Sequence, residues 1–163
     1  MDNPSDNAFP LINKQAARTV QGRCTEVLVT SFADKILILI SQYGRVGSLI
    51  HTTVDQSSLM SSGAMASSSA DLASTTSHFL LGAGASASKK TQLYQVYASH
   101  ISQMIQHQNP AETRPVVLSL ALAIQEPDME QSTTEEEELQ QRRQDRELFE
   151  NVIELVNECS VWV

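Results

Sequence analysis

Residues 27–50 constrain the fold more than any other part of the chain. They read VLVTSFADKILILISQYGRVGSLI. The beginning of this stretch alternates in the manner of a half-buried strand. The run Ile36–Ile40 follows as five consecutive apolar residues, three of them β-branched. Such a run is typical of a strand that is buried on both faces in the middle of a sheet. Gly44 and Gly47 then permit a tight connection into more extended chain at 48–53. We predict three consecutive strands joined by short turns, a meander at the centre of the fold.

Further strands are predicted on both sides of this run, and two helices follow. The six predicted strands cover residues 11–20, 23–31, 36–40, 48–53, 76–82 and 116–124. Apolar residues at helical spacing predict a helix at 92–107 and another at 135–158. The first helix is expected to bury Leu93, Val96, Tyr97, His100, Ile101, Met104 and Ile105. The second is expected to bury a stripe made of Leu148, Phe149, Val152, Ile153, Val156 and Cys159. We therefore expect an α+β fold of about six mostly antiparallel strands, with the first four in a meander and two α-helices bracketing the last strand.

The length of 163 residues predicts a single domain, 1–163. Residues 1–8 are polar and are predicted to be a disordered tail. Residues 55–75 are rich in serine and predict a flexible insertion, because this composition does not offset the entropy of ordering. The serines also permit phosphorylation, but a plain flexible insertion is the favoured interpretation. Residues 125–134 are read as a polar connection.

Charge and targeting signals narrow the class of protein. The formal charge is −8, and residues 125–163 hold twelve acidic residues against three arginines. An acidic chain is a poor candidate for nucleic-acid binding. No window is apolar enough to span a membrane, and residues 1–9 lack the features of a signal peptide. Two cysteines favour a reducing compartment, while one disulfide between them remains an alternative. We expect a soluble cytoplasmic protein, with the nucleus as a second location.

The segment Gly82–Thr91 carries the strongest enzyme-like signal. It follows an apolar strand and precedes a helix, which is the context of a dinucleotide-binding turn. However, Lys89 stands where a P-loop has its second glycine, and at least four predicted strands come before the segment without helices between them. A small-residue linker, Gly82–Lys90, is the favoured interpretation. A nucleotide-binding enzyme remains the alternative.

Histidines and cysteines offer no clear catalytic or metal site. His100 and His107 share a helix face but lie two turns apart, and no third ligand has suitable spacing. Cys24 lacks an identifiable base, so we predict a buried thiol, and Cys159 fits the core stripe of the last helix. We predict no catalytic, cofactor-binding or metal-binding residue, no cofactor and no enzymatic activity.

The turn at 43–47 is the predicted protein-binding site. Its residues are Tyr43, Gly44, Arg45, Val46 and Gly47. They lie at the end of the most apolar strand, where a rigid scaffold presents side chains to a partner. Tyrosine and arginine are favoured interface anchors. The alternative is that Tyr43 closes the edge of the core and Arg45 is merely solvated.

The strand–turn–strand followed by aromatic-Gly-basic-apolar-Gly resembles the proteasome assembly chaperone 3 family. The similarity extends upstream to Pro10–Gln15 and downstream to Phe79–Gly82, Val116–Ile124 and a final helix that ends in Cys159–Trp162. These segments cover about two thirds of the chain, in the family's order. The Ser-rich insertion, the longer Gly82–Lys90 linker and the acidic stretch Glu126–Glu138 depart from the family pattern.

The resemblance implies a function as well as a fold. It implies a non-catalytic chaperone that forms a heterodimer with a proteasome assembly chaperone 4-like subunit. The pair would promote assembly of the α-ring of the 20S proteasome, engage α-type subunits such as α5, and leave before the mature particle forms. A homodimer is expected where the partner is absent. The alternative is a general protein-interaction or adaptor module with the same fold.

Overall fold

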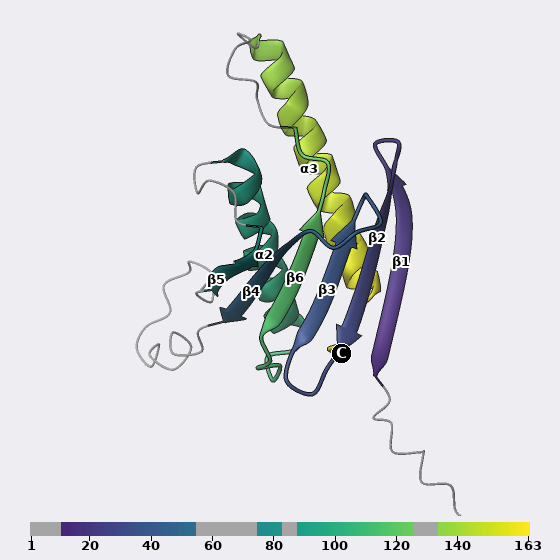
Figure 1. The fold of residues 1–163 in the computed structure, drawn as a ribbon, viewed down its shortest axis with the longest axis vertical. Coiled ribbons are helices and arrows are strands. Elements are labelled where there is room, and N and C mark those ends of the chain that lie inside the picture. The colour runs from purple at the N-terminus through teal and green to yellow at the C-terminus, as the bar shows by residue number, and fades with distance from the viewer. Residues whose placement is uncertain (1–10, 55–74, 83–87, 126–133) are drawn as a thin grey trace, which may run out of the picture.

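The computed structural model describes residues 11–54, 75–82, 88–125 and 134–163. Within these residues, six strands form one sheet and two helices lie against it (Figure 1). The strands are β1 (Ile12–Val20), β2 (Arg23–Ser31), β3 (Ile36–Ser41), β4 (Ser48–Val54), β5 (Thr75–Leu81) and β6 (Val116–Ala121), and the helices are α2 (Lys89–Gln108) and α3 (Glu135–Glu158). The expected α+β class, with a mostly antiparallel sheet, is confirmed.

The order of strands differs from the predicted meander. The sheet runs β1-β2-β3-β6-β4-β5. The first three strands form the expected antiparallel meander, but β6 lies between β3 and β4, parallel to the former and antiparallel to the latter. The prediction of four strands in a meander is therefore wrong. β6 is the last strand in the sequence and is strongly apolar. It lies between β3 and β4, which a hairpin would have paired directly with each other.

The connection at 42–47 shows why β3 and β4 are not paired. This connection crosses the end of β6 and is fixed to it by hydrogen bonds (Figure 1). The Gln42 N–H donates to the Ala121 carbonyl at 2.9 Å, and the Gly47 N–H donates to Ser119 Oγ at 3.0 Å. A Cβ at Gly47 would lie 1.9 Å from the carbonyl oxygen of Leu120. Glycine is thus required here by a close crossing of two backbones rather than by a tight hairpin.

The core lies between the sheet and the two helices. Ile36, Ile38 and Ile40 of β3 are completely or almost completely buried, as are their neighbours Val27 and Val29 on β2. Helix α2 packs on β4, β5 and β6, while α3 packs on β1 and β2. Burying a side chain of this size stabilises a fold by about 1.5–3 kcal/mol. These strands therefore provide much of the stabilisation of the fold.

Helix α2 only partly confirms its predicted buried face: Tyr97, Ile101 and Ile105 are buried as expected, whereas His100 is exposed. Its buried residues are Thr91, Tyr94, Tyr97, Ala98, Ile101, Ser102 and Ile105. Val96, which was expected in the core, is 52% exposed. Ala98 and Ser102, which were not expected in the core, are buried. The Leu122 N–H donates to the Tyr94 hydroxyl at 3.1 Å and satisfies the polar end of a buried ring.

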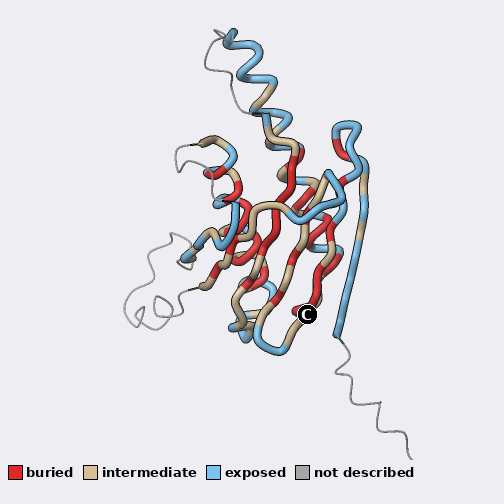
Figure 2. The backbone as a smooth tube through the Cα atoms, in the orientation of Figure 1, coloured by how far each residue is buried: buried red, intermediate tan, exposed pale blue. Residues whose placement is uncertain are grey.

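Helix α3 largely confirms its predicted apolar stripe. Leu148, Val152, Leu155 and Val156 are buried, and Phe149 and Ile153 pack against the core. The helix begins with a capping box between Thr134 and Glu137. Its N-terminal half is mostly exposed and extends beyond the sheet, as Figure 2 shows. Only the C-terminal half therefore contributes to the core.

Several sequence predictions lie outside the described residues. These are the tail at 1–8, the insertion at 55–75 apart from Thr75, which begins β5, and the connection at 125–134 apart from its two end residues. The single-domain organisation stays a prediction. Neither helix in the described part of the chain is long and apolar enough to cross a membrane.

Candidate protein-interaction surfaces

The helices cover one face of the sheet and leave the opposite face without a second layer (Figure 1). Apolar side chains of four adjacent strands meet on this uncovered side, and each is half-buried. They are Leu28 of β2, Leu37 and Leu39 of β3, Val117 of β6 and Leu49 of β4. In the register, Leu28 lies opposite Leu39, and Leu37 lies beside Val117. We call these five residues the open face.

The open face explains why the prediction that β3 is buried on both faces is only partly met. The run Ile36–Ile40 has the composition of a strand buried on both faces. In the structure Ile36, Ile38 and Ile40 are covered by helices, whereas Leu37 and Leu39 remain half-buried. Apolar faces of sheets are normally packed against a second layer. The composition of β3 thus fits a protein in which something further covers the open face.

Polar side chains lie beside this apolar centre on β2, β4 and β5. His51 of β4 lies directly opposite His78 of β5, on the same side of the sheet as the open face. Leu81, opposite Leu49, is 62% exposed and extends the apolar surface toward the β5 edge. Glu26 is exposed on the same side of β2. An apolar centre with a polar rim is the usual anatomy of a protein–protein interface.

A second surface lies at the end of the sheet, around Tyr43. Tyr43 is 47% exposed. The guanidinium carbon of Arg45 lies 5.1 Å from the ring centroid, and that of Arg23, at the start of β2, lies 5.9 Å from it. Both distances fall within the range of cation–π contacts. We call Arg23, Tyr43 and Arg45 the turn cluster.

The backbone of the turn is held in one conformation. Ser41 Oγ accepts hydrogen bonds from the Tyr43 and Arg45 N–H groups, each at 3.1 Å. Gly44 has a φ of 61°, a left-handed conformation that favours glycine. Gly44 and Gly47 therefore shape the turn, while Tyr43 and Arg45 face solvent.

Three of the five predicted site residues thus present exposed side chains, since Val46 is 60% exposed. The exposure of Tyr43 shows that it does not close the edge of the core. Arg23 was missed by the sequence analysis because it is twenty residues distant from Tyr43. Only the adjacency of β2 and β3 brings the two side chains together.

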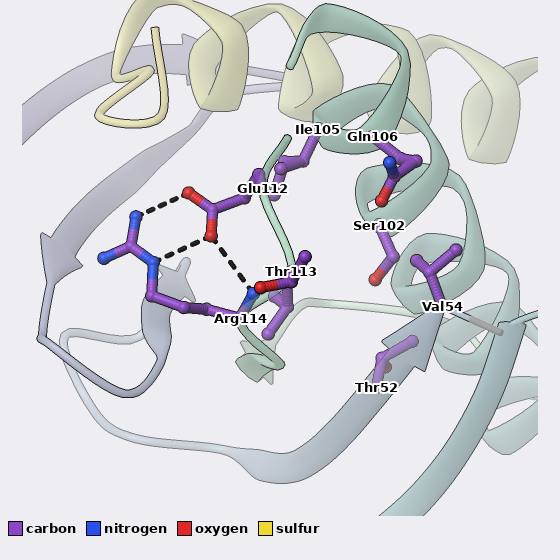
Figure 3. Close-up of a pocket in the computed structure, with 9 residues that line it drawn as sticks. Thr52, Val54, Ser102, Ile105, Gln106, Glu112, Thr113 and Arg114 are labelled. Atoms are coloured by element: carbon purple, nitrogen blue, oxygen red, sulfur yellow. Dashed lines mark hydrogen bonds and ion pairs between the residues drawn. The ribbon is translucent and has the colours of Figure 1, made fainter. Parts of the chain in front are cut away.

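A small polar pocket lies at the opposite end of β6, between β4, α2 and the loop before β6 (Figure 3). It is lined by Thr52, Val54, Ser102, Ile105, Gln106, Glu112, Thr113, Arg114 and Val116. The space measures about 20 Å³, which holds one or two water molecules and no substrate. Ser102 Oγ is buried there without a hydrogen-bond partner among the described residues. An ordered water is the natural partner for this hydroxyl.

The ion pair beside this pocket has a structural role. Arg114 donates to both carboxylate oxygens of Glu112, at 2.8 and 2.5 Å, and also to Ser31 Oγ and the Phe32 carbonyl. These hydrogen bonds with Arg114 hold the pKa of the Glu112 carboxyl below its usual range. The pair fastens the loop before β6 to the end of β2.

The cysteines divide between core and surface. Cys159 is 1% exposed, as predicted, and burial raises the pKa of its thiol. Cys24 is exposed, so the prediction of a buried thiol there is wrong. It lies near the tip of the β1–β2 hairpin, opposite the exposed Thr19, on the side of the sheet that the helices leave uncovered. Among the described histidines, cysteines and carboxylates, no group of three or more could hold a metal ion.

The segment Gly82–Thr91 does not have the surroundings of a nucleotide-binding turn. Residues 83–87 lie outside the described part of the chain. The strand before them, β5, is an edge strand antiparallel to β4, not the parallel strand that a dinucleotide-binding unit requires. Lys89 Nζ lies 2.6 Å from a carboxylate oxygen of Asp145. This lysine therefore ties α2 to α3.

Comparison with known proteins decides the family. The sequence profile of the family described as proteasome assembly chaperone 3 matches residues 38–135, which is more than half of the chain. The chain belongs to the proteasome assembly chaperone 3 family. The matched region includes most of β3, the turn at 43–47, β4, β5, α2 and β6. A comparison with curated proteins found no match.

A solved structure shares the fold of this family member. It is a chain from the crystal structure of a chaperone complex for yeast 20S proteasome assembly. The TM-score is 0.54 at 14% sequence identity, and the alignment covers 90% of this chain and 97% of the other. At this identity the similarity establishes the fold.

Proposed function

We propose that this protein is a non-catalytic chaperone that promotes assembly of the 20S proteasome α-ring as a heterodimer with a second small assembly chaperone. Membership of the proteasome assembly chaperone 3 family supports the chaperone role. The open face is the observation that supports a permanent partner. We place this activity in the cytoplasm, with the nucleus as a second site.

The open face is suited to a partner that contributes a sheet of its own. Leu28, Leu37, Leu39, Leu49 and Val117 are spread over four strands and form a broad, gently twisted apolar surface. Two such sheets pack face to face about 10 Å apart and bury their apolar side chains between them. Helices α2 and α3 would then lie on the outside of the pair. The partner is a chaperone 4-like subunit, and a second copy of this chain takes its place when that subunit is absent.

The α-type proteasome subunits, with α5 as the first candidate, contact a different surface. A chaperone that leaves the finished particle needs a weaker contact than the one that holds its dimer together. The residues Tyr43–Gly47 are separate from the centre of the open face and expose three side chains. Tyrosine and arginine contribute strongly to small interfaces. This turn is the proposed contact with the α-ring.

The experiment is affinity purification of the tagged chain from its own cells, with mass spectrometry of the proteins recovered. We expect one further small chaperone and free α-type subunits, without the β-type subunits of mature particles. A tagged chain with lysines in place of Leu37 and Leu39 is the control and should lose the small chaperone. Recovery of neither kind of partner at normal expression would refute the proposal and leave a general adaptor module.

A further inference from the structure

The turn cluster contains two arginines that have no acidic partner among the described residues. Arg18, Arg114 and Arg146 each form an ion pair at 2.8 Å or less. Arg23 and Arg45 form none within the described chain, although the protein carries a formal charge of −8. Unpaired arginines that converge on one ring, in an acidic protein, call for an explanation.

Acidic side chains of α3 near the tip of the β1–β2 hairpin have other partners. Gln21, at the tip of the β1–β2 hairpin, donates to the Gln144 carbonyl and lies 3.4 Å from a carboxylate oxygen of Glu147. Asp145 is paired with Lys89. The structure thus places carboxylates on the neighbouring helix without using them to neutralise the turn cluster. The positive charge of the two guanidiniums remains available to another molecule.

The geometry of the cluster fits an anion. The guanidinium carbons of both arginines lie within 6 Å of the centroid of the Tyr43 ring, so two positive charges gather around one exposed side chain. A carboxylate that reaches this cluster is attracted by both charges and accepts charge-assisted hydrogen bonds from a guanidinium fork. The hydrogen bonds that Ser41 Oγ accepts from the Tyr43 and Arg45 N–H groups hold the backbone of the turn in place before binding. Little ordering entropy is then lost when the partner arrives.

We propose that the turn cluster binds an acidic segment of a partner protein, with a glutamate or aspartate between Arg23 and Arg45 and an adjacent apolar residue against Tyr43. Val46, 60% exposed beside the cluster, supplies the apolar surface for that neighbour. The apolar component and the overall negative charge of the chain favour a peptide over a phosphate backbone. The identity of the partner as an α-type proteasome subunit rests on the proposed function, whereas the acidic character of the segment rests on the cluster alone.

The test is an NMR titration of the isotopically labelled full chain with a blocked peptide, Glu-Glu-Leu-Leu. The amide signals of Arg23, Tyr43, Arg45 and Val46 should shift and saturate. The peptide Gln-Gln-Leu-Leu, which has the same shape without charge, should bind at least tenfold more weakly. The double variant Arg23→Gln/Arg45→Gln should lose at least tenfold in affinity for the acidic peptide.

Matched variants separate local recognition from net charge. Arg142→Gln/Arg143→Gln makes the same change in charge on the exposed part of α3 and should bind the acidic peptide like the wild type. Tyr43→Phe should also bind normally, because the ring is kept. The proposal would be overturned if the shifts were centred elsewhere or if both peptides bound equally. It would also be overturned if an eight-nucleotide oligothymidylate bound more tightly at these same amides.

A competition experiment separates this inference from the proposed function. Purified α-type subunits are added to the chain with and without the acidic peptide. If the peptide binds the cluster but no α-type subunit binds the chain, the inference stands and the proposed function fails. If α-type subunits bind the Arg23→Gln/Arg45→Gln variant as tightly as wild type, and the peptide does not bind, the inference fails and the proposed function stands.

Discussion

At the scale of single residues, polar side chains hold the connections of this fold in place. Gln42 donates to Thr25 Oγ1 and accepts from the Ala123 N–H, so one side chain joins three segments. Trp162 donates through its ring nitrogen to Gln108, and Asn109 donates to the Trp162 carbonyl. These contacts fasten the end of the chain to α2. Each such hydrogen bond makes a modest net contribution to stability. Removing one partner is nevertheless costly when the other is left buried without a hydrogen bond.

The most consequential of these residues is Arg114. Its side chain pairs with Glu112 in the loop before β6 and donates to Ser31 and Phe32 at the end of β2. Arg114→Ala leaves a carboxylate that is only 8% exposed without its counter-charge. We expect a loss of about 2–3 kcal/mol in the free energy of unfolding, measured by urea denaturation. Arg146→Ala, which breaks an exposed pair on α3, is the control and should leave stability unchanged within error. Equal effects of the two variants would contradict this role.

Stability should also depend on pH through Glu112. Its pKa in the folded protein is lowered, chiefly by the hydrogen bond from Arg114. A carboxyl with a lowered folded pKa stabilises the fold above its unfolded pKa of about 4.3, and this stabilisation is lost as pH falls through the folded pKa. The advantage of wild type over Glu112→Gln should therefore shrink as pH falls from about 6 to about 3. Thermal denaturation at several pH values measures it, and a constant difference would exclude the mechanism.

At the scale of elements, the sequence predicts strands and helices better than it predicts how they pair. All six strands lie close to their expected bounds because alternation and β-branched residues are local signals. The place of β6 between β3 and β4 depends on contacts between residues some eighty positions apart, such as Gln42 with Ala121. No local pattern encodes that pairing. The two glycines were consequently interpreted as a hairpin turn.

Residues of the candidate sites were likewise predicted where the signal is local and missed where it depends on strand pairing. Tyr43, Arg45 and Val46 were predicted because aromatic and basic residues in a turn are a local signal. Arg23 and the open face were missed, since both require knowledge of which strands are neighbours and which face the helices cover. The apolar composition of Leu37 and Leu39 carried the signal of a second covered face, but a single sequence does not say what covers it. The α2 face was misjudged because Ala98 and Ser102 were not counted as buried positions.

Lysines on the open face should separate folding from association. We expect Leu37→Lys/Leu39→Lys to weaken the complex with the second chaperone by at least about 100-fold, because two charges would be buried in an apolar interface. The variant should remain folded, since both side chains are only half-buried in the free chain. Val96→Lys on α2 is the matched control at a 52% exposed position and should bind normally. Isothermal titration measures the affinity, and unchanged binding of the double variant would exclude the open face as the interface.

At the scale of the whole molecule, the core and the two candidate surfaces lie in different parts of the fold. The helices and one face of the sheet form the core (Figure 1). In the function proposed above, the open face binds the permanent partner, and the turn cluster at the end of the sheet binds the releasable one. The acidic residues are concentrated in the C-terminal part of the chain, four of them in the first turn of α3. These four carboxylates interact favourably with the positive end of the helix dipole. They lie apart from the apolar centre of the open face.

The most direct test of the central claim is depletion of this protein from its own cells, followed by native gels that resolve free subunits, half-assembled rings and complete 20S particles. The account predicts fewer complete particles and an accumulation of free or misassembled α-type subunits. Wild-type protein should restore assembly, and the Leu37→Lys/Leu39→Lys variant should not. Normal levels of 20S particles and no accumulated α-type subunits after full depletion would contradict the account.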